Sequence, residues 1–383
     1  MSGMEAPTGA RFASASATGE DWRTTVKACL DKLGPVEGCN LGFLYISDAL
    51  AADAVSIVTL MRGVTGIKDW VGTVGIGVCA TGEELFDRPA IAVMTARLPP
   101  GSFHLPAPIT ESIEGFEPET AEWLKTHAPV LGLVHGDPRN PRTHEIIPEL
   151  SDAVGGFLVG GLTSSRTNYG QFGGRPGTAP VIEGGVSGVL FSGQVPVATG
   201  LTQGCTPIGP IRKITRAQNN IIVEIDGRPA LEVFKEDIGE LLARDLRRVA
   251  GYIFAALPIT GSDTGDYLVR NLVGIDPNNG LIAIGDMVEP GRGIMFARRD
   301  RASAEADLER MLTILKKRLK GPPRGGIYVS CLARGPALFG DDSEELKAIR
   351  DRLGDFPLVG FFANGEISHN RLYGYTGVLT LFL

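Results

Sequence analysis

The chain has 383 residues, which is too long for one ordinary hydrophobic core, so we expect two domains. Its formal net charge of −7 argues against a dedicated nucleic-acid binder, because such proteins carry a basic surface. The five cysteines show no CxxC spacing, no apolar run reaches membrane-helix length, and residues 1–10 lack the features of a signal peptide. We therefore expect a reduced, cytoplasmic protein that spans no membrane.

The first half of the chain predicts alternating helices and strands. We expect the first dozen residues to fray and an amphipathic helix to begin at the N-cap Thr18. Further strands and one more helix are then predicted, in the order strand Leu41–Ser47, helix Ala51–Arg62, strand Val71–Val78, strand Ala90–Ala96, strand Leu131–His135 and strand Gly156–Val159. Residues 100–128 are expected to form a Pro-rich connector, and Ser164–Pro180 a long surface loop.

The second half predicts hairpins around one long helix. Turn signals at Gly193-Gln194, Asn219-Asn220 and Asn278-Asn279-Gly280 each separate two apolar segments, which is typical of a β-hairpin. A helix is expected from Pro229 to Ala250, and a second from Ser303 to Leu319. The terminal strand Val378–Leu383 is apolar on both faces, which predicts a central position in a sheet.

Together these elements predict an α+β fold of mixed α/β layers. We expect an N-terminal tail and helix over residues 1–37 and two domains over residues 38–226 and 227–383, each with a largely antiparallel or mixed sheet flanked by helices. Val71-Gly72 and the later Gly82-Glu83 pair resemble Val359-Gly360 and Gly365-Glu366, with Val159-Gly160 as a looser third copy. Either the two domains share a substructure, or this short apolar match arose by chance.

Several common site motifs are excluded. Gly77 to Gly82 has the glycine spacing of a phosphate-binding loop, but Glu83 stands where a lysine is needed and would repel a phosphate. The histidines show no metal-ligand spacing, and no Gly-x-Ser-x-Gly sequence occurs. We expect neither a metal nor a cofactor.

Polar side chains follow the ends of apolar strands at two places. Cys331 and Arg334 follow one strand near the C-terminus, and Asn364, Gly365 and Glu366 follow the next. Cys79, Gly82 and Glu83 form a similar turn in the first half, and Arg270 lies within an apolar strand, where it needs a counter-charge if it is buried. A guanidinium close to Cys331 favours the thiolate, although most cysteines of this kind are only packed.

The segment from Pro229 to Leu383 resembles the FIST C domain in Tyr267-Leu-Val-Arg270-Asn, Ser330-Cys-Leu-Ala-Arg334-Gly and Pro357-Leu-Val-Gly-Phe-Phe-Ala-Asn-Gly-Glu366. Gly38 to Ile225 is similar to the FIST N domain, chiefly in Val71-Gly-Thr-Val-Gly-Ile-Gly-Val-Cys-Ala-Thr-Gly-Glu83. The resemblance implies a sensory module that binds a small polar ligand, with amino acids among the candidates, and passes the signal to a partner protein. Some FIST proteins carry an attached output domain, for which residues 1–37 leave no room.

On this reading Arg334 or Arg270 would pair with a ligand carboxylate, and Glu366 or Glu83 would accept an ammonium group. Two alternatives stay open. Cys331 could be the nucleophile of an enzyme with His369 as its base. Alternatively, Ser164–Pro180 or the Pro-rich connector could bind a partner protein.

Overall fold

The computed structural model describes residues 10–113, 115–173, 179–259 and 266–383. The chain divides into two compact units. Unit 1 comprises residues 1–202, 309–372 and 376–383, and unit 2 comprises residues 203–308 and 373–375. These two units differ from the two domains that the sequence predicts, whose boundary lies between residues 226 and 227. That boundary therefore stays a proposal about sequence domains.

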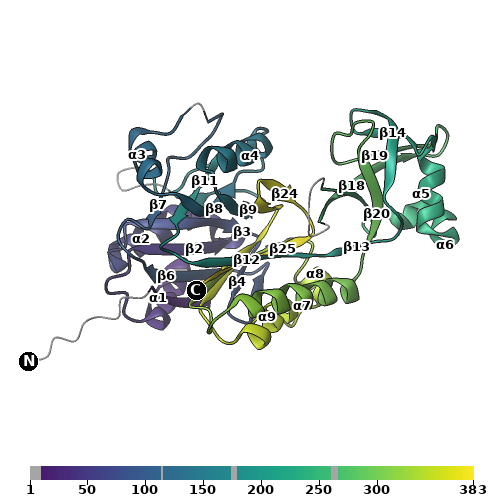
Figure 1. The fold of residues 1–383 in the computed structure, drawn as a ribbon. Coiled ribbons are helices and arrows are strands. Elements are labelled where there is room, and N and C mark those ends of the chain that lie inside the picture. The colour runs from purple at the N-terminus through teal and green to yellow at the C-terminus, as the bar shows by residue number, and fades with distance from the viewer. Residues whose placement is uncertain (1–9, 114, 174–178, 260–265) are drawn as a thin grey trace, which may run out of the picture. The chain divides into compact units, whose positions relative to one another are not determined.

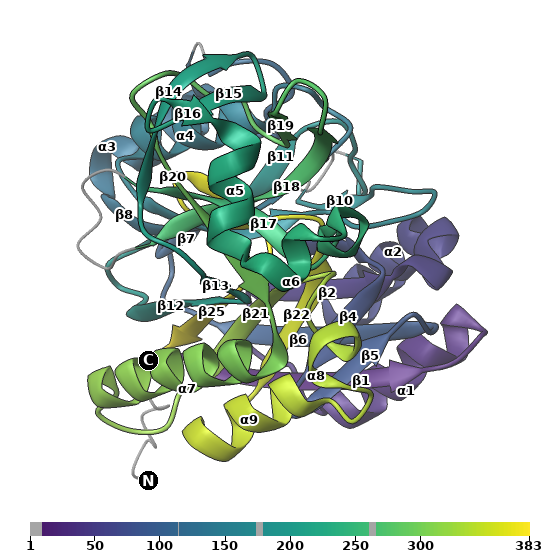
Figure 2. The ribbon, with the colours of Figure 1, turned by 90° about the vertical axis from the view of Figure 1, so that its right-hand side faces the viewer.

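The described part of unit 1 contains three sheets, which Figure 1 and Figure 2 show from two sides. Sheet 1 has the strand order β1 (Arg11–Thr18), β6 (Ala90–Arg97), β2 (Leu41–Ser47), β3 (Asp69–Gly75), β10 (Gln171–Phe172). Sheet 2 has the order β24 (Arg371–Tyr373), β23 (Glu366–His369), β9 (Phe157–Leu162), β8 (Pro129–Gly136), β11 (Val186–Ser192), β7 (Phe103–His104). Sheet 3 has the order β12 (Val197–Gln203), β25 (Thr376–Phe382), β21 (Gly325–Cys331), β22 (Leu358–Ala363), β4 (Gly77–Ala80), β5 (Glu83–Phe86).

Each sheet is built around the same unit of a strand, a helix, a parallel strand and an antiparallel closing strand. Repeat 1 is β2, α2 (Ala54–Thr65), β3 and β6, repeat 2 is β8, α4 (Thr143–Val154), β9 and β11, and repeat 3 is β21, α9 (Glu344–Leu353), β22 and β25. The second strand of every repeat carries a glycine at one register position: Gly72 faces Leu44, Gly160 faces Val134 and Gly360 faces Tyr328. The echo in the sequence therefore corresponds to three structural repeats.

These glycines are required by close packing of the backbone. A Cβ atom on Gly72 or Gly160 would lie 1.8 Å from the carbonyl oxygen of Leu44 or Val134, and one on Gly360 would lie 1.7 Å from that of Tyr328. No other residue fits at such a distance, so the repeated Val-Gly pair has a steric origin.

The repeats exchange arms. After its second strand, repeat 1 sends β4 and β5 into sheet 3, repeat 2 sends β10 into sheet 1, and repeat 3 sends β23 and β24 into sheet 2. The exchange is cyclic, so unit 1 has pseudo-threefold symmetry. The segment Val71–Val78, which the sequence predicts as one strand, is divided at Ile76 for this reason, because β3 and β4 belong to different sheets.

The inner faces of the three sheets share one hydrophobic core, to which β2 contributes Phe43 and Tyr45, β8 Leu131 and Leu133, and β21 Ile327 and Val329. Helices cover the outer faces: α1 (Trp22–Leu33) and α2 lie on sheet 1, and α4 lies on sheet 2. The other helices with residues in unit 1 are η1 (Asp48–Asp53), α3 (Pro118–Thr126), α7 (Arg301–Arg318) and α8 (Pro336–Phe339).

Unit 2 is a small antiparallel barrel. Six strands close on themselves in the order β20 (Gly293–Arg299), β14 (Arg212–Gln218), β15 (Ile221–Ile225), β19 (Leu281–Ile284), β18 (Tyr267–Asp276), β17 (Ile253–Pro258) and back to β20. Its other elements are β13 (Cys205–Pro207), β16 (Arg228–Pro229), α5 (Ala230–Ile238), α6 (Glu240–Ala243) and η2 (Leu246–Val249). Helix α5 buries Leu231 and Phe234 in the barrel core.

The mixed α+β fold, the two predicted hairpins of unit 2 and the central position of β25 are confirmed. Four details differ from the sequence-based expectation. The hairpin expected around Gly193-Gln194 is wrong, because β11 belongs to sheet 2 and β12 to sheet 3. Residues Arg11–Thr18 form a strand and do not fray, and α1 is capped by Asp21 in place of Thr18. The helix expected from Pro229 to Ala250 breaks at Gly239, whose φ of 81° is incompatible with a helix. The segment Ser164–Pro180 lies partly outside the described residues, but its Gln171 and Phe172 form the buried strand β10.

Candidate functional site

The outer face of sheet 3 differs from the outer faces of the other two sheets. At the positions of Tyr328 and Ser330, repeat 1 has Leu44 and Ile46, which pack under α2 in a hydrophobic cluster. Repeat 2 has Val134 and Gly136 at these positions, and Val134 packs under α4. Repeat 3 therefore places two hydroxyl groups where the fold elsewhere uses apolar contacts.

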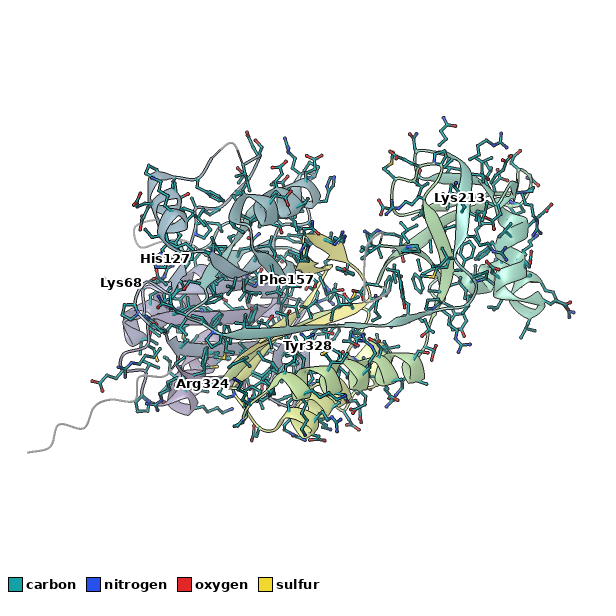
Figure 3. The ribbon with its side chains drawn as sticks, viewed as in Figure 1. Lys68, His127, Phe157, Lys213, Arg324 and Tyr328 are labelled. Atoms are coloured by element: carbon teal, nitrogen blue, oxygen red, sulfur yellow. The ribbon has the colours of Figure 1, made fainter. Side chains whose placement is uncertain are left out.

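Both hydroxyls donate hydrogen bonds to a buried glutamate of α9. Glu345 accepts from Tyr328 Oη at 2.6 Å and from Ser330 Oγ at 2.9 Å. Arg334 donates to Glu345 Oε1 through Nε at 2.7 Å and Nη2 at 2.5 Å, and both side chains are fully buried. Although burial disfavours a charged guanidinium, the nearby Glu345 carboxylate raises the pKa of Arg334 above its usual value. Figure 3 labels Tyr328 on its strand inside unit 1.

Glu84 of β5 lies at the other side of this ion pair. Its Oε1 accepts from the backbone N–H groups of Glu345 and Leu346 at 3.2 and 3.4 Å, so it caps the N-terminus of α9. Its Oε2 is buried and has no hydrogen-bond partner among the described residues. Burial and the charge of Glu345 raise the pKa of Glu84 to about 7. Burial raises the pKa of the neighbouring Cys79 thiol, and the carboxylates of Glu84 and Glu345 raise it further.

Glu366 of β23 lies near Arg334 and Cys331. Its Oε2 accepts from the backbone N–H of Thr376 at 3.0 Å and from Thr376 Oγ1 at 2.7 Å. Within the described residues its Oε1 is buried without a partner. Burial raises the pKa of Glu366 to about 8, although the bonds from Thr376, a hydrogen bond with Cys331 and the charge of Arg334 all act in the opposite direction.

Three ionisable side chains each keep one buried polar atom that these contacts do not satisfy. Arg334 Nη1, Glu84 Oε2 and Glu366 Oε1 are buried and have no hydrogen-bond partner within the described part of the chain. Buried polar atoms of folded proteins are nearly always bonded, and each exception needs an explanation. A guanidinium N–H can bind an anionic oxygen, and the two carboxyl oxygens can bind N–H groups. We define this set, together with Glu345, Tyr328, Ser330 and Cys331, as the buried polar cluster.

A short helix covers the cluster. The ring of Phe339 on α8 lies 5.1 Å from the guanidinium carbon of Arg334 and is itself buried. Glycines with positive φ flank α8 on both sides, at 51° for Gly335 and 102° for Gly340. Since Arg334, Glu345 and Glu366 are fully buried, a ligand can reach them only if a covering segment moves. Helix α8 is short, bounded by glycines and in contact with Arg334, which makes it the best candidate.

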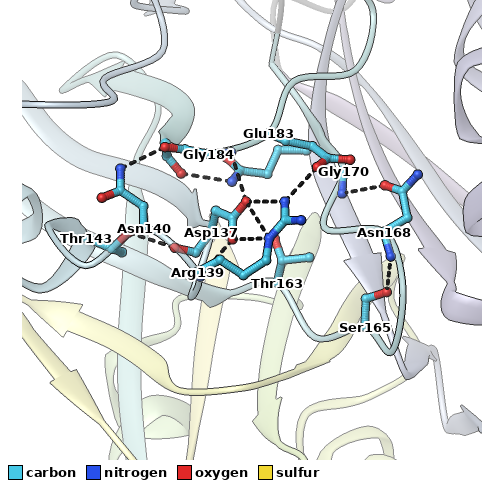
Figure 4. A network of polar contacts seen from close by, with 12 residues as sticks. Asp137, Arg139, Asn140, Thr143, Thr163, Ser165, Asn168, Gly170, Glu183 and Gly184 are labelled. Atoms are coloured by element: carbon cyan, nitrogen blue, oxygen red, sulfur yellow. Dashed lines mark hydrogen bonds and ion pairs between the residues drawn. The ribbon is translucent and has the colours of Figure 1, made fainter.

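The equivalent strand end of repeat 2 carries a different polar network, shown in Figure 4. Asp137, at the position of Cys331, accepts from Arg139 Nη2 at 2.7 Å and from the N–H of Gly184 at 2.8 Å. Arg139 also donates to Glu183 at 2.6 Å. Although burial opposes it, this bonding lowers the pKa of Asp137. Both carboxylate oxygens of Asp137 are bonded, so the network is a structural clamp.

Two surface pockets of about 510 Å³ lie elsewhere on unit 1. One is lined mainly by apolar residues around Val197, with Arg318 as its charged member. The other lies beside β1 and includes Lys32 and Asp355. These charged side chains are exposed to solvent, so neither pocket contains a buried group that calls for a ligand.

The structure brings together Cys79, Cys331, Arg334 and Glu366 of the residues that we expected to form the site. Glu83 is exposed, and its neighbour Glu84 points into the cluster instead. Gly82 forms the turn between β4 and β5, with φ of 67°. Gly365 lies in the turn before Glu366 with φ of 134°, whereas the Asn364 side chain beside it is exposed.

Two further residues are not members of the cluster. Arg270 belongs to unit 2, where it pairs with Asp286 at 2.9 Å. His369, considered as a base for Cys331, is exposed and packs edge-on against Phe157, while Glu366 is the acidic group that contacts Cys331. Sequence reasoning missed Glu84, Glu345 and Tyr328. Nothing in the sequence indicates that Glu345 faces sheet 3, because charged residues on an amphipathic helix usually face solvent.

The described residues contain no group of three His, Cys, Asp or Glu side chains placed to hold a metal ion. They also contain no helix that is both long and apolar enough to cross a membrane.

The sequence matches two family models. The FIST N domain matches residues 40–228, and the FIST C domain matches residues 230–369. The chain is 35% identical over 362 residues to uncharacterized protein Rv0628c of Mycobacterium tuberculosis, which covers 90% of this chain and 91% of that protein. It is 32% identical over 352 residues to uncharacterized protein Mb0898c of Mycobacterium bovis, with 87% of each chain covered. FIST domains are generally associated with sensory functions in signal transduction.

Proposed function

The chain belongs to the FIST family, and from this premise and the buried polar cluster we propose that it is a cytoplasmic sensor of a small amino-acid-like ligand. The observation that carries the proposal is the set of three buried polar atoms of ionisable side chains, Arg334 Nη1, Glu84 Oε2 and Glu366 Oε1, that have no partner among the described residues. A ligand carboxylate accepts from Arg334, and a ligand ammonium donates to Glu366.

Comparison between repeats supports a role for these groups beyond folding. The fold closes its helix over Leu44 and Ile46 in repeat 1, so it does not require Tyr328, Ser330 and a buried ion pair in repeat 3. Buried ion pairs contribute little to stability compared with apolar packing, because desolvation offsets their attraction. The buried ionisable groups of repeat 3 are therefore better explained by ligand recognition than by a contribution to stability.

The expected affinity follows from the number of contacts. Hydrogen bonds to charged groups contribute roughly 1.5–3 kcal/mol each, and about 8 kcal/mol corresponds to a micromolar dissociation constant. Three such bonds near the upper end of this range therefore reach micromolar binding, and a further bond offsets the cost of opening the cover.

Calorimetry and thermal shift against a panel of amino acids test the proposal. We expect at least one amino acid to bind with a micromolar dissociation constant and to raise the melting temperature. Glu366→Gln should weaken that binding at least tenfold, while the exposed neighbour substitution Glu83→Gln leaves it unchanged. Absence of both heat and thermal shift for the whole panel would contradict a sensor of amino-acid-like ligands.

A further inference from the structure

The buried polar cluster contains more acidic groups than basic groups. Arg334 is its cation, and Glu345 already pairs with it through two hydrogen bonds. Glu84 and Glu366 then remain as two further buried carboxyl groups with no cation of their own in direct contact among the described residues. A neutral amino acid brings one ammonium group, which satisfies only one of the two.

Glu84 and Glu366 lie on different faces of sheet 3. Glu84 pairs with Cys79, Cys79 faces Gly360, and Gly360 faces Tyr328, so Glu84 shares the outer-face row with Tyr328. Glu366 contacts Cys331, which is three residues beyond Tyr328 and therefore on the inner face. Arg334 follows the end of the strand and influences both carboxyl groups electrostatically. One elongated ligand can thus contact Arg334 in the middle and a carboxyl group on each side.

We infer that the ligand of this site is a diamino acid, whose second ammonium group binds Glu84 while its carboxylate and first ammonium group bind Arg334 and Glu366. This inference rests on the proposed function and names the ligand class. It gives each unpartnered atom a partner of matching character: the carboxylate for Arg334 Nη1 and one ammonium for each carboxyl oxygen. The raised pKa values of Glu84 and Glu366 agree with carboxyl groups that lack a counter-charge until the ligand arrives.

The position of Glu84 Oε2 supports a ligand that passes beneath α8. A Cβ atom placed on Gly335 would lie 3.1 Å from Glu84 Oε2 and 2.5 Å from the ring of Phe362. Gly335, at the start of the covering helix, therefore packs directly against the free oxygen of Glu84, and a side chain at this position would clash with Phe362 and crowd that oxygen. Arg334 is the residue just before Gly335, so the guanidinium that would bind the ligand carboxylate belongs to the same short segment.

The inference is tested by comparing ligands that differ only in the second amine. Calorimetry would measure the affinity of the full chain for 2,3-diaminopropionate, ornithine and lysine, with alanine, norvaline and norleucine as neutral counterparts of similar length. We expect at least one diamino acid to bind tenfold or more tightly than its neutral counterpart. The chain-length series also reports the separation of the two carboxyl groups.

Substitutions separate recognition of the second amine from capping of α9. Glu84→Gln keeps the oxygen that caps α9 and removes the charge. We expect it to abolish the preference for the diamino acid, so that the diamino acid and its neutral counterpart bind this variant with affinities within twofold of each other. Glu366→Gln should weaken both ligands, and Glu83→Gln should change neither.

The possible failures are distinct. If neutral amino acids bind as tightly as every diamino acid, or if Glu84→Gln weakens both classes equally, the ligand class is wrong and the amino-acid sensor stands. If no amino acid of either class binds, both proposals are wrong.

Discussion

Glu366 and Gln171 occupy equivalent positions in two of the exchanged arms. Glu366 faces Gly161 of β9 and Gln171 faces Thr73 of β3, each one residue beyond the glycine of the second strand. Gln171 uses both of its polar atoms, since it donates to the carbonyl of Gly185 at 2.9 Å and accepts from Ser187 at 2.7 Å. The fold thus needs only a neutral amide at this position, and the carboxyl group of Glu366 exceeds that need.

The first prediction concerns stability against pH. The folded pKa of Glu366, about 8, exceeds its ordinary value of 4.5, so between these values the folded state binds more protons than the unfolded state. Stability therefore falls as pH rises from about 5 to 8, and Glu84 adds to this loss up to about pH 7. Urea unfolding at several pH values should show the decline in the wild type. Glu366→Gln should reduce the slope, and an unchanged slope would show that Glu366 ionises freely in the folded protein.

The second prediction concerns the buried ion pair. Glu345→Gln leaves the fully buried Arg334 without its anionic partner, which should cost about 3–5 kcal/mol of unfolding free energy. The double substitution Arg334→Met with Glu345→Leu should recover much of this loss, because apolar residues already fill the equivalent space in repeat 1. Chemical denaturation of the three proteins measures both effects. If Glu345→Gln is as stable as the wild type, the ion pair of Arg334 and Glu345 is not desolvated in the folded protein.

The third prediction concerns the cover over the site. Phe339→Ala removes the ring that lies on Arg334 and should accelerate ligand association at least several-fold. Stopped-flow fluorescence measures the rate, and Phe339→Leu, which keeps an apolar side chain, serves as the matched control. Identical association rates in all three proteins would assign access to a different segment.

The fourth prediction concerns the repeat glycines. Gly160→Ala would place a methyl group 1.8 Å from the carbonyl oxygen of Val134, which no local adjustment can relieve, so we expect the protein not to fold. Gly63, inside α2, has no atom within 4 Å of its would-be Cβ. Gly63→Ala should therefore stabilise the protein by about 0.5–1 kcal/mol. Circular dichroism melting of both variants distinguishes the two roles.

The sequence predicted the parts of the fold that depend on local patterns. Leu41–Ser47 is a continuous apolar run and forms β2, and the Asn-Asn-Gly turn forms the hairpin of β18 and β19. The arm exchange could not be predicted, because strand pairing between distant segments leaves no periodic signal in either one. Strand β1 was missed because its alternating Ala and Ser residues have low strand propensity.

The candidate site was predictable only in part, for a related reason. Arg334 and Glu366 were identified because they follow strands directly, where a side chain is expected to meet others. Glu84 was missed in favour of Glu83 because a one-residue shift in register determines which of two adjacent glutamates points toward α9. Glu345 resembles any acidic residue in the first turn of a helix until α9 is placed on sheet 3.

We propose that a ligand ammonium group provides the counter-charge that Glu366 lacks. At pH 7 Glu366 is mostly protonated, surrounded by Cys331, Arg334 and Thr376, and Glu84 is about half protonated beside Cys79, Glu345 and Arg334. Calorimetry in two buffers of different ionisation enthalpy measures the protons exchanged on binding. We predict release of about one proton per bound neutral amino acid in the wild type and markedly less in Glu366→Gln. Tight binding without net proton release in the wild type would contradict it.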